Sequence, residues 1–477
     1  MLQYQPYLDQ LANHTTESQA LVNPHTKEEI ARMPICKEEQ MEKAIKQADE
    51  AFKTIKNMPA HERSDILNRA SDILQENKQM VAETIAQEAA KPMKYALAEV
   101  DRTVQTLKFS SVEARKLEGE SIPMDAAPNG AGRDAYTIFE PIGVIGAITP
   151  FNFPLNLVVH KVGPAIASGN TVIVKPAEKT PLSAILLREA LVQAGLPEDA
   201  YHVVPGEGKV LGDVLLKSDA VQKITFTGSP PVGREIKSNA GLKKVTLELG
   251  NNSALYVDKS MNDRMDDVVP KAVHGSYAYN GQVCISTQRI YVHEDIADIF
   301  AEQFVKGAEQ LTFGDPLDEE TDVCNLIDES SQQTLLEWIE DAEQQGAKVL
   351  TGGKAKDNGI APTVLTDVPE GAKIMKEEAF GPVVIINRVA SGDEALIAMN
   401  NSQYGLSAGL FSNDMKQAID MAHGLEVGQV LVNDVPTLRF DHMPYGGRKQ
   451  SGYGYEGVKY AIHEMVNRKM ISLNYRF

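Results

Sequence analysis

The stretch that decides the fold is residues 143–178, GVIGAITPFNFPLNLVVHKVGPAIASGNTVIVKPAE. It contains two short apolar runs, GVIGAIT (143–149) and TVIVK (171–175), which have the length and β-branched content of buried strands. The segment between them, LNLVVHKVGPAIASG, has the length and apolar content of a helix. Two strands joined by a helix are typical of a βαβ unit in a parallel sheet.

The same alternation continues towards the C-terminus. The runs YHVV, KITFT (223–227) and KVTLEL (244–249) alternate with helical patterns at 208–217 and from about 230. A second block after Gly250 contains the strand-like runs QRIYVH, PVVIINRV, AGLFS and GQVLVN. We therefore expect two α/β domains, divided near 249–251.

The segments that flank these blocks have other patterns. The first 120 residues are mostly helical in pattern, with amphipathic spacing over 38–56 and 61–88. Residues 120–142 are rich in Pro, Gly and Asn and include a short apolar–polar alternation at 134–139, which predicts a hairpin or an arm. The final segment, KMISLNYRF, is strand-like, and such chain ends often pair with a partner subunit.

Length and charge limit the classes of function. At roughly 150 residues per domain, 477 residues predict two to four domains. The 47 basic and 66 acidic residues give a net charge of −19, which argues against nucleic acid or an anionic membrane as the main partner. A small anionic substrate stays open, because a pocket can be locally basic on an acidic protein.

The sequence predicts a cytoplasmic protein. It has no apolar run of about 18 residues, and its start, MLQYQPYLDQ, lacks the pattern of a signal peptide. Cys36, Cys284 and Cys324 are widely spaced, without a CxxC pair. This distribution indicates free thiols in a reducing compartment, with neither disulfides nor a metal site.

Two strand ends could hold a nucleotide. FTGSPPVG (226–233) follows a strand and opens a helix, so its backbone N–H groups could approach a pyrophosphate. Its spacing is not GxGxxG, and an ordinary helix N-cap is the alternative. Lys175 and Glu178 follow the strand TVIVK, where they could bond ribose hydroxyls or form a salt bridge in an exposed loop.

Three further residues could carry chemistry. Asn152, in TPFNFP, could cap a helix or stabilise an oxyanion. Glu248 ends an apolar strand, where it could be a general base with a raised pKa or a solvent-facing acid. Cys284, in NGQVCIST, could be a buried structural thiol or, if it lies near a helix N-terminus, a nucleophile.

Taken together, the motifs resemble those of the aldehyde dehydrogenase superfamily over nearly the whole chain and in the family order. The stretches that carry the resemblance are TPFNFP, KPAE, FTGSPPVG, LELGNNS, GQVC, EEAFGP and PYGGRKQSG. The resemblance implies an α/β fold with a Rossmann-like cofactor domain, an α/β catalytic domain and a small β oligomerisation arm. The implied boundaries are 1–119 with 141–249, then 250–457, and 120–140 with 458–477.

The resemblance also implies a covalent oxidation of an aldehyde in two steps. The Cys284 thiolate would form a thiohemiacetal, whose oxyanion lies between the Asn152 amide and the Cys284 backbone N–H. Transfer of hydride to the nicotinamide would leave a thioester, which water activated by Glu248 would hydrolyse. Lys161 and Glu456 correspond to a proton relay in the family, although such a pair is more often structural.

The cofactor implied by the resemblance is NAD, with NADP as a second option. Lys175 and Glu178 would bind the adenosine ribose, and the Glu178 carboxylate would repel a 2′-phosphate, although some family members with an acid there accept both cofactors. Ser229 would bind the pyrophosphate, and Glu378 with Phe380 would bind the nicotinamide ribose and ring. The remaining implied contacts are Thr149, Pro150, Phe151, Thr227, Gly228 and Leu249. A homodimer or homotetramer is also implied.

One departure from the family pattern bears on the second step. Many members have tryptophan before the catalytic asparagine, whereas this chain has Phe151. The same change occurs in a branch that transfers the acyl group to coenzyme A, but that branch lacks the general-base glutamate, and Glu248 is present here. Hydrolysis is therefore expected, with acyl transfer to coenzyme A as the alternative and a non-catalytic scaffold as a third.

The substrate implied by the resemblance is a short hydroxylated or anionic aldehyde. TPFNFPLNLVVHK and FDHMPYGGRKQSGYGYEG resemble a group that oxidises lactaldehyde, phosphonoacetaldehyde or sulfolactaldehyde, close to non-phosphorylating glyceraldehyde-3-phosphate dehydrogenases. An anionic substrate needs a cationic partner, for which Arg102, Arg439 and His442 are the candidates. Each of them could instead form a structural salt bridge.

Overall fold

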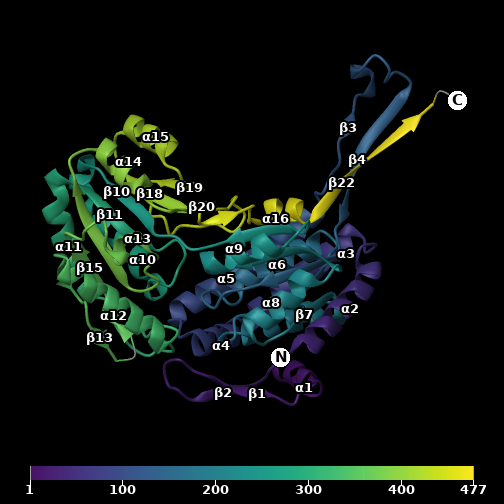
Figure 1. Cartoon of the computed structure of the whole chain (residues 1–477), viewed down its shortest axis with the longest axis horizontal. Coiled ribbons are helices and arrows are strands. Elements are labelled where there is room, and N and C mark those ends of the chain that lie inside the picture. Colours follow the sequence, from purple (N-terminus) through teal and green to yellow (C-terminus); the bar gives the residue numbers. More distant parts are fainter. Residues whose placement is uncertain (1, 358, 476–477) are drawn as a thin grey trace.

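The protein consists of two α/β domains and a projecting β arm. The computed structural model describes residues 2–357 and 359–475. In Figure 1 the N-terminal half, coloured purple to teal, forms one domain, and the green segments form the other. The arm of β3, β4 and β22 extends away from the first domain (Figure 1). The predicted fold class is confirmed.

The first domain is built on a six-stranded sheet in the order β21-β9-β8-β5-β6-β7, in which only β21 is antiparallel to its neighbour. The chain runs outward from β5 to β6 and β7 and then crosses to β8, on the other side of β5. The strand order therefore reverses between β5 and β8, and open α/β sheets bind ligands at such a point. The strands are β5 (Val144–Ile148), β6 (Thr171–Lys175), β7 (Tyr201–Val203), β8 (Val221–Thr227), β9 (Lys244–Glu248) and β21 (Gly452–Tyr453).

Helices cover both faces of this sheet. Helices α6 (Asn156–Ala167) and α7 (Leu182–Gln193) pack in one buried cluster, whereas α8 (Gly208–Lys217) and α9 (Pro230–Asn239) pack in another on the opposite face. Neighbouring residues of β5 contribute to different clusters, Val144 to one and Ile145 to the other. Burial on both faces explains why the strands are continuous apolar runs rather than alternating ones.

The N-terminal region adds helices and one hairpin that the sequence patterns did not indicate. Its elements are α1 (Gln5–Ala12), β1 (Ser18–Val22), β2 (Glu29–Pro34), α2 (Glu38–Ile55), α3 (Ala60–Glu76), α4 (Lys78–Ala89) and α5 (Met93–Ala114). The predicted helical patterns are confirmed by α2, α3 and α4. The β1–β2 hairpin was missed because most of its side chains are exposed, which leaves no apolar face to show a period of two.

The second domain contains a seven-stranded sheet in the order β12-β15-β16-β11-β10-β18-β19, with β12 antiparallel to its neighbour. Its strands are β10 (Ser253–Val257), β11 (Thr287–His293), β12 (Lys348–Thr351), β15 (Thr363–Thr366), β16 (Val383–Val389), β18 (Ser407–Phe411) and β19 (Gln429–Val432). Its helices are α10 (Met265–Tyr277), α11 (Ala297–Glu309), α12 (Glu329–Gln344), α13 (Lys373–Lys376), α14 (Gly392–Asn400) and α15 (Met415–Gly424). The short strands are β13 (Ala355–Lys356), β14 (Gly359–Ile360), β17 (Tyr404–Gly405) and β20 (Arg448–Lys449).

The arm is a three-stranded antiparallel sheet in the order β22-β4-β3. The C-terminal strand β22 (Val466–Asn474) pairs with β4 (Arg133–Pro141) of its own chain, and β3 (Ser121–Ile122) pairs with the other edge of β4. The outer edge of β22 is a sheet edge and can still accept another strand. Helix α16 (Val458–Glu464), which the sequence analysis grouped with the arm, contributes Val458 and Ile462 to the core of the first domain.

The chain passes from the first domain to the second and returns. It leaves after β9 and comes back at β21, which pairs with β9 so that Gly452 lies opposite Glu248. Residues 452–453 therefore belong to the first sheet, and the domain boundary at 457 stays a prediction. Within the two described ranges, no helix is long and apolar enough to cross a membrane.

A left-handed turn precedes Cys284. Tyr279, Asn280 and Gly281 have φ angles of 47°, 56° and 68°. The Asn280 side chain holds this turn, since its Oδ1 accepts a hydrogen bond from the Cys324 backbone N–H at 2.6 Å. A Cβ atom on residue 281 would lie 2.1 Å from the carbonyl oxygen of Gly381, so only glycine fits.

We predict that Gly281→Ala lowers the free energy of unfolding by about 3 kcal/mol or more, because it adds a backbone clash to an unfavourable φ. Gly241→Ala is the matched control, since Gly241 also has a positive φ of 57° but no atom within 4 Å of the added Cβ. The control should cost only about 1 kcal/mol. Urea unfolding of both variants checks this, and equal losses would contradict the clash.

Candidate active site

Four of the five predicted catalytic residues line one cavity, of about 170 Å³, between the two domains, whereas Lys161 lies outside its lining. The first domain contributes Asn152, which follows β5, and Glu248 at the end of β9. The second contributes Cys284 and Arg439, and Glu456 lies on the returning segment. The full lining comprises Tyr95, Ala98, Glu99, Arg102, Asn152, Phe153, Asn156, Leu157, Thr227, Glu248, Leu249, His274, Ala278, Tyr279, Val283, Cys284, Ile285, Leu406, Thr437, Arg439, Tyr445 and Glu456.

Cys284 faces the side-chain amide of Asn152. The thiol lies in a turn between the 3₁₀ segment Ala278–Gly281 and β11, and it is only partly buried. The Asn152 Nδ2 atom is 4.0 Å from the Cys284 Sγ and donates to the Gln282 carbonyl at 3.0 Å. Asn152 therefore does not act as a helix cap here, and its amide is directed towards the sulfur and the backbone beside it.

The pKa of Cys284 differs from the sequence-based expectation. Burial, together with the Glu378 and Glu248 carboxyl groups, raises the pKa of the thiol to about 12, against a smaller lowering effect of the Asn152 amide. Among the described residues, no helix N-terminus lies directly after the thiol to lower its pKa, because the turn leads into the strand β11. In the free protein the thiol is therefore protonated at neutral pH, and a base must remove its proton before it can attack.

Glu248 is buried, which excludes the solvent-facing alternative. Only 3% of the residue is exposed, and within the described residues neither carboxyl oxygen has a hydrogen-bond partner. Burial and the charge of Glu456 raise the pKa of Glu248 well above its ordinary value, opposed by Arg439 and Lys161. Such surroundings favour the protonated carboxyl group, which gains the ability to accept a proton as the pH rises.

Glu456 is held by two cations beside the cavity. Its carboxylate is 2.6 Å from Lys161 Nζ and 3.2 Å from Arg439 Nη2. Lys161 also donates to Thr227 Oγ1 at 2.8 Å, and the Arg439 guanidinium lies 3.6 Å from the Tyr445 ring centroid. Burial opposes ionisation, but Lys161 and Arg439 together lower the pKa of Glu456, so it stays charged.

The ends of β5, β6 and β8 carry the residues that are expected to bind the adenosine end of a dinucleotide. Lys175 Nζ lies 3.6 Å from Glu178 Oε1, which accepts the Gly208 N–H at 3.0 Å. Thr149 Oγ1 is buried without a partner in the part of the chain that the structure describes. Ser229 is the N-cap of α9, and its side chain makes no capping bond. These polar groups are therefore available to a ligand.

The nicotinamide end would lie at the junction of the domains. Glu378 accepts the Asn251 N–H at 3.0 Å, and burial raises the pKa of Glu378 to about 7. The rings of Phe151 and Phe380 meet edge to face, with centroids 5.8 Å apart. A Cβ on Gly250 would lie 2.6 Å from Glu378 Oε2, so the backbone approaches this carboxyl group closely. The other expected contacts, Pro150, Gly228 and Leu249, follow the ends of β5, β8 and β9.

The three candidate substrate residues have different surroundings. Arg102, on α5, lines the cavity, keeps 31% of its side chain exposed and forms an ion pair with Asp441 at 2.7 Å. Arg439 lines the cavity and is almost completely buried. His442 does not line the cavity, and its ring is exposed, with its centroid 5.0 Å from that of Phe109.

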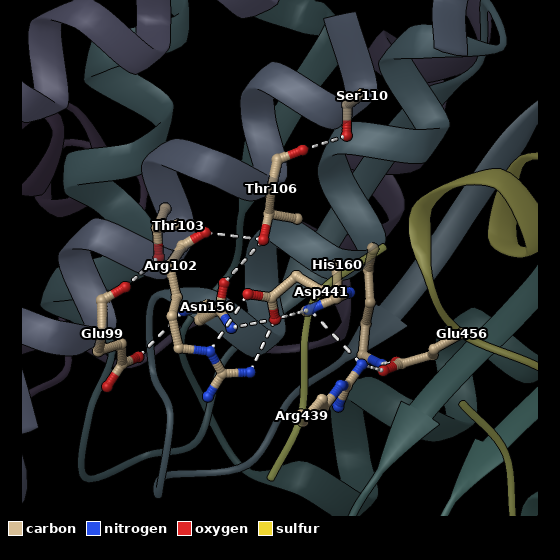
Figure 2. A network of polar contacts seen from close by, with 11 residues as sticks. Glu99, Arg102, Thr103, Thr106, Ser110, Asn156, His160, Arg439, Asp441 and Glu456 are labelled. Carbon is tan, nitrogen blue, oxygen red and sulfur yellow. Dashed lines mark hydrogen bonds and ion pairs between the residues drawn. The ribbon is translucent and has the colours of Figure 1, made fainter. Parts of the chain in front are cut away.

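Sequence reasoning missed Asp441, which accepts hydrogen bonds from Arg102, Asn156 and His160 (Figure 2). The only hint of Asp441 in the sequence was its position in FDHM, between Phe440 and His442 and two residues after Arg439. An acid at that position indicates a charge network but does not reveal that its partners lie on α5 and α6.

The aldehyde dehydrogenase family model matches residues 11–471. The chain belongs to this family. It is 42% identical to a 3-sulfolactaldehyde dehydrogenase of Priestia aryabhattai, over 99% of this chain and 98% of the relative. It is 40% identical to a lactaldehyde dehydrogenase of Methanococcus aeolicus, over 95% of this chain and 96% of the relative.

Solved structures of the family are also similar. Aldehyde dehydrogenase 21 of Physcomitrella patens, solved with the reaction product succinate, has 37% identity and a TM-score of 0.94, with 96% of this chain and 95% of that chain covered. The glyceraldehyde-3-phosphate dehydrogenase GapN of Methanocaldococcus jannaschii was solved with NADP. It has 38% identity and a TM-score of 0.91, with 96% of this chain and 99% of that chain covered. This aldehyde dehydrogenase is therefore an NAD(P)-dependent oxidoreductase.

The burial of Glu248 beside Glu456 generates a prediction about pH. Glu456→Gln removes a buried negative charge and leaves Lys161 and Arg439 facing Glu248, which should lower the pKa of Glu248. The rise of aldehyde oxidation with pH should therefore move to lower pH, by about one unit or more. A pH–rate profile of kcat measures this.

Glu464→Gln, on the more exposed face of α16, is the control and should leave the profile in place. Circular dichroism must show that both variants fold, because an unpaired buried cation costs about 3–5 kcal/mol. A folded Glu456→Gln enzyme with the wild-type profile would contradict the coupling.

Proposed function

We propose that this aldehyde dehydrogenase oxidises a short hydroxylated or anionic aldehyde to its carboxylate by hydrolysing a thioester on Cys284, with NAD preferred over NADP. The observation that carries the proposal is one small cavity lined by the Cys284 thiol, the Asn152 amide, the Glu248 carboxyl and two guanidinium groups. These are the groups that covalent capture, oxyanion stabilisation, water activation and anion binding require.

The first step is capture of the aldehyde. Because the pKa of the thiol is raised, a base must take its proton, and the ionised form of Glu248 lines the same cavity. The sulfur then forms a bond to the carbonyl carbon, and the carbonyl oxygen becomes an oxyanion. The Asn152 Nδ2 donor and the Cys284 backbone N–H would stabilise this oxyanion, a contribution of about 3 kcal/mol per donor.

The cofactor site supports the oxidation. When bound, NAD(P)⁺ supplies the hydride acceptor that converts the thiohemiacetal into a thioester. Lys175, Glu178 and Ser229 would hold its adenosine and pyrophosphate end, and Glu378 with Phe380 would hold the other. Of the Lys161 and Glu456 pair, buried beside Glu248, the Glu456 carboxylate raises the pKa of Glu248, and the pair would pass on its proton.

The second step is hydrolysis of the thioester. Both Glu248 oxygens are without partners among the described residues, so the ionised carboxylate is free to hold and deprotonate a water molecule. The resulting hydroxide attacks the thioester carbon, the carbon–sulfur bond breaks and the carboxylate product leaves. The presence of this base supports hydrolysis over acyl transfer to coenzyme A, which remains the alternative.

The cavity supports a short anionic substrate. A volume of about 170 Å³ suits a chain of few carbons, and Arg102 and Arg439 present guanidinium groups, which bind carboxylates, sulfonates and phosphates. The curated relatives act on sulfolactaldehyde and lactaldehyde, and one structural neighbour was solved with succinate. His442 is the weakest of the three candidates, because it lies outside the cavity lining.

We further propose a homodimer or homotetramer in the cytoplasm. The outer edge of β22 can accept another strand, and Met470 and Leu473 on this strand are exposed apolar residues. Cys36, Cys284 and Cys324 are all free thiols, as expected in a reducing compartment.

We predict that Cys284→Ala abolishes formation of NADH with every aldehyde and leaves folding unchanged, because no other residue can carry the acyl group. Cys36→Ala, a buried thiol away from the cavity, should retain activity. Glu248→Gln should lose the first-turnover release of NADH as well as steady turnover, because the same carboxylate takes the proton of Cys284 and activates the water. If coenzyme A is required for turnover of the wild-type enzyme, the hydrolytic mechanism is wrong.

The substrate class is tested by comparing kcat/KM for lactaldehyde, glyceraldehyde 3-phosphate, sulfolactaldehyde, succinic semialdehyde and hexanal. Short hydroxylated or anionic aldehydes should be preferred, and a clear preference for hexanal would contradict the proposal. A parent enzyme that is inactive with the whole panel would instead support a non-catalytic scaffold.

For the cofactor, Glu178→Gln should raise kcat/KM for NADP relative to NAD by about tenfold, because it removes a carboxylate that repels the 2′-phosphate. Glu207→Gln, an exposed acid near the same lysine, is the matched control and should change the ratio little. An unchanged ratio in Glu178→Gln would show that Glu178 does not select the cofactor.

A further inference from the structure

Asp441 lies directly behind the substrate cavity and is not part of its lining. It is 5% exposed and bonds Arg102 with both oxygens, at 3.2 Å to Nε and 2.7 Å to Nη2. Its Oδ1 also accepts from Asn156 Nδ2 at 3.1 Å and lies 2.8 Å from His160 Nε2. Figure 2 shows Asp441 between Arg102 on one side and His160 on the other.

This arrangement fixes both the direction and the charge of Arg102. A two-point contact with a carboxylate holds the plane of the guanidinium group, and Asp441 occupies the edge formed by Nε and Nη2. The side chain keeps 31% exposure at the cavity, where the rest of the guanidinium group can meet a substrate. Burial opposes ionisation of Asp441, but the hydrogen bond from His160 and the charge of Arg102 lower its pKa below the usual range.

The other charges around the cavity nearly cancel. The buried carboxylate of Glu99 is paired with Lys91, and Arg102 is paired with Asp441. Burial lowers the pKa of His160, which is therefore neutral at pH 7, and burial raises the pKa of Glu248, which favours its neutral form.

One positive charge is left over. Lys161 and Arg439 share the single carboxylate of Glu456, so this group of three carries one net positive charge. Without Asp441, the unpaired guanidinium of Arg102 would add a second net positive charge to the cavity.

We propose that Asp441 is a positioning residue that holds Arg102 at the cavity and limits the anion subsite to one net positive charge, so that the enzyme selects aldehydes with a single negative charge over dianionic phosphates. This inference rests on the anionic-substrate part of the proposed function. A monoanion is neutralised in such a subsite, whereas a dianion keeps one uncompensated buried charge, which is costly.

The test measures kcat and KM for three short aldehydes with different charges: lactaldehyde (neutral), sulfolactaldehyde (monoanionic) and glyceraldehyde 3-phosphate (dianionic). The wild-type enzyme should prefer sulfolactaldehyde. Asp441→Asn, which is nearly isosteric and removes one negative charge, should raise the kcat/KM ratio of the dianion to the monoanion by about tenfold, since added positive charge favours the dianion more. KM should carry this change, and kcat for lactaldehyde should stay within about twofold.

Arg102→Gln provides an independent measurement, since it removes a positive charge from the same pair. The dianion-to-monoanion ratio should fall below the wild-type value, so the expected order is Arg102→Gln, wild type, Asp441→Asn. This variant also keeps the inference testable if Asp441→Asn fails to fold. The matched control is Asp65→Asn, because Asp65 pairs at 2.6 Å with Arg115, the C-cap residue of the same helix α5, away from the cavity. Its ratio should equal that of the wild type.

Two outcomes would overturn the role of Asp441. An unchanged ratio in folded Asp441→Asn would remove the charge-limiting function, and an equal loss with all three aldehydes would indicate a purely structural residue. A different outcome would overturn the proposed anionic specificity itself, namely wild-type enzyme that uses lactaldehyde better than both anions. The two failures are therefore distinguishable.

Discussion

The antiparallel pairing of β21 with β9 is the constraint on which the site depends. It places Gly452 opposite Glu248, so the chain that left the first domain after β9 is brought back beside the residue at which it left. Four residues later the same segment delivers Glu456, which binds Lys161 from α6. Residues separated by about half the sequence thereby become neighbours, and the second domain is fixed over the carboxyl ends of the first sheet.

Buried charge shapes the chemistry of the crevice. Glu456 shares two cations and stays ionised, whereas Glu248 has neither a cation of its own nor a hydrogen bond within the described chain and favours its neutral form. Two carboxyl groups in one low-dielectric site are thus pushed towards opposite protonation states, which is how environment assigns different roles to identical groups. Elsewhere at the cavity, the charge of Arg102 is balanced in the same way by the buried carboxylate of Asp441.

The sequence predicted what depends on local pattern. The parallel strands are continuous apolar runs, and the motifs containing Asn152, Glu248 and Cys284 were sufficient to propose that these residues meet, as they do in the cavity. Properties that depend on tertiary surroundings were not accessible. The high pKa of Cys284 comes from burial and from carboxyl groups distant in sequence, and the exposed position of His442 could not be read from its neighbours.

The raised pKa of Cys284 has a consequence for the resting enzyme. Peroxides and alkylating reagents react with the thiolate rather than the thiol, so a sulfur that keeps its proton resists chemical damage. Because burial also raises the pKa of the Glu248 base in the cavity, the thiolate is scarce in the resting enzyme. Slow activation of the nucleophile thus also protects it, and an idle molecule is less vulnerable to oxidative stress than one that is turning over.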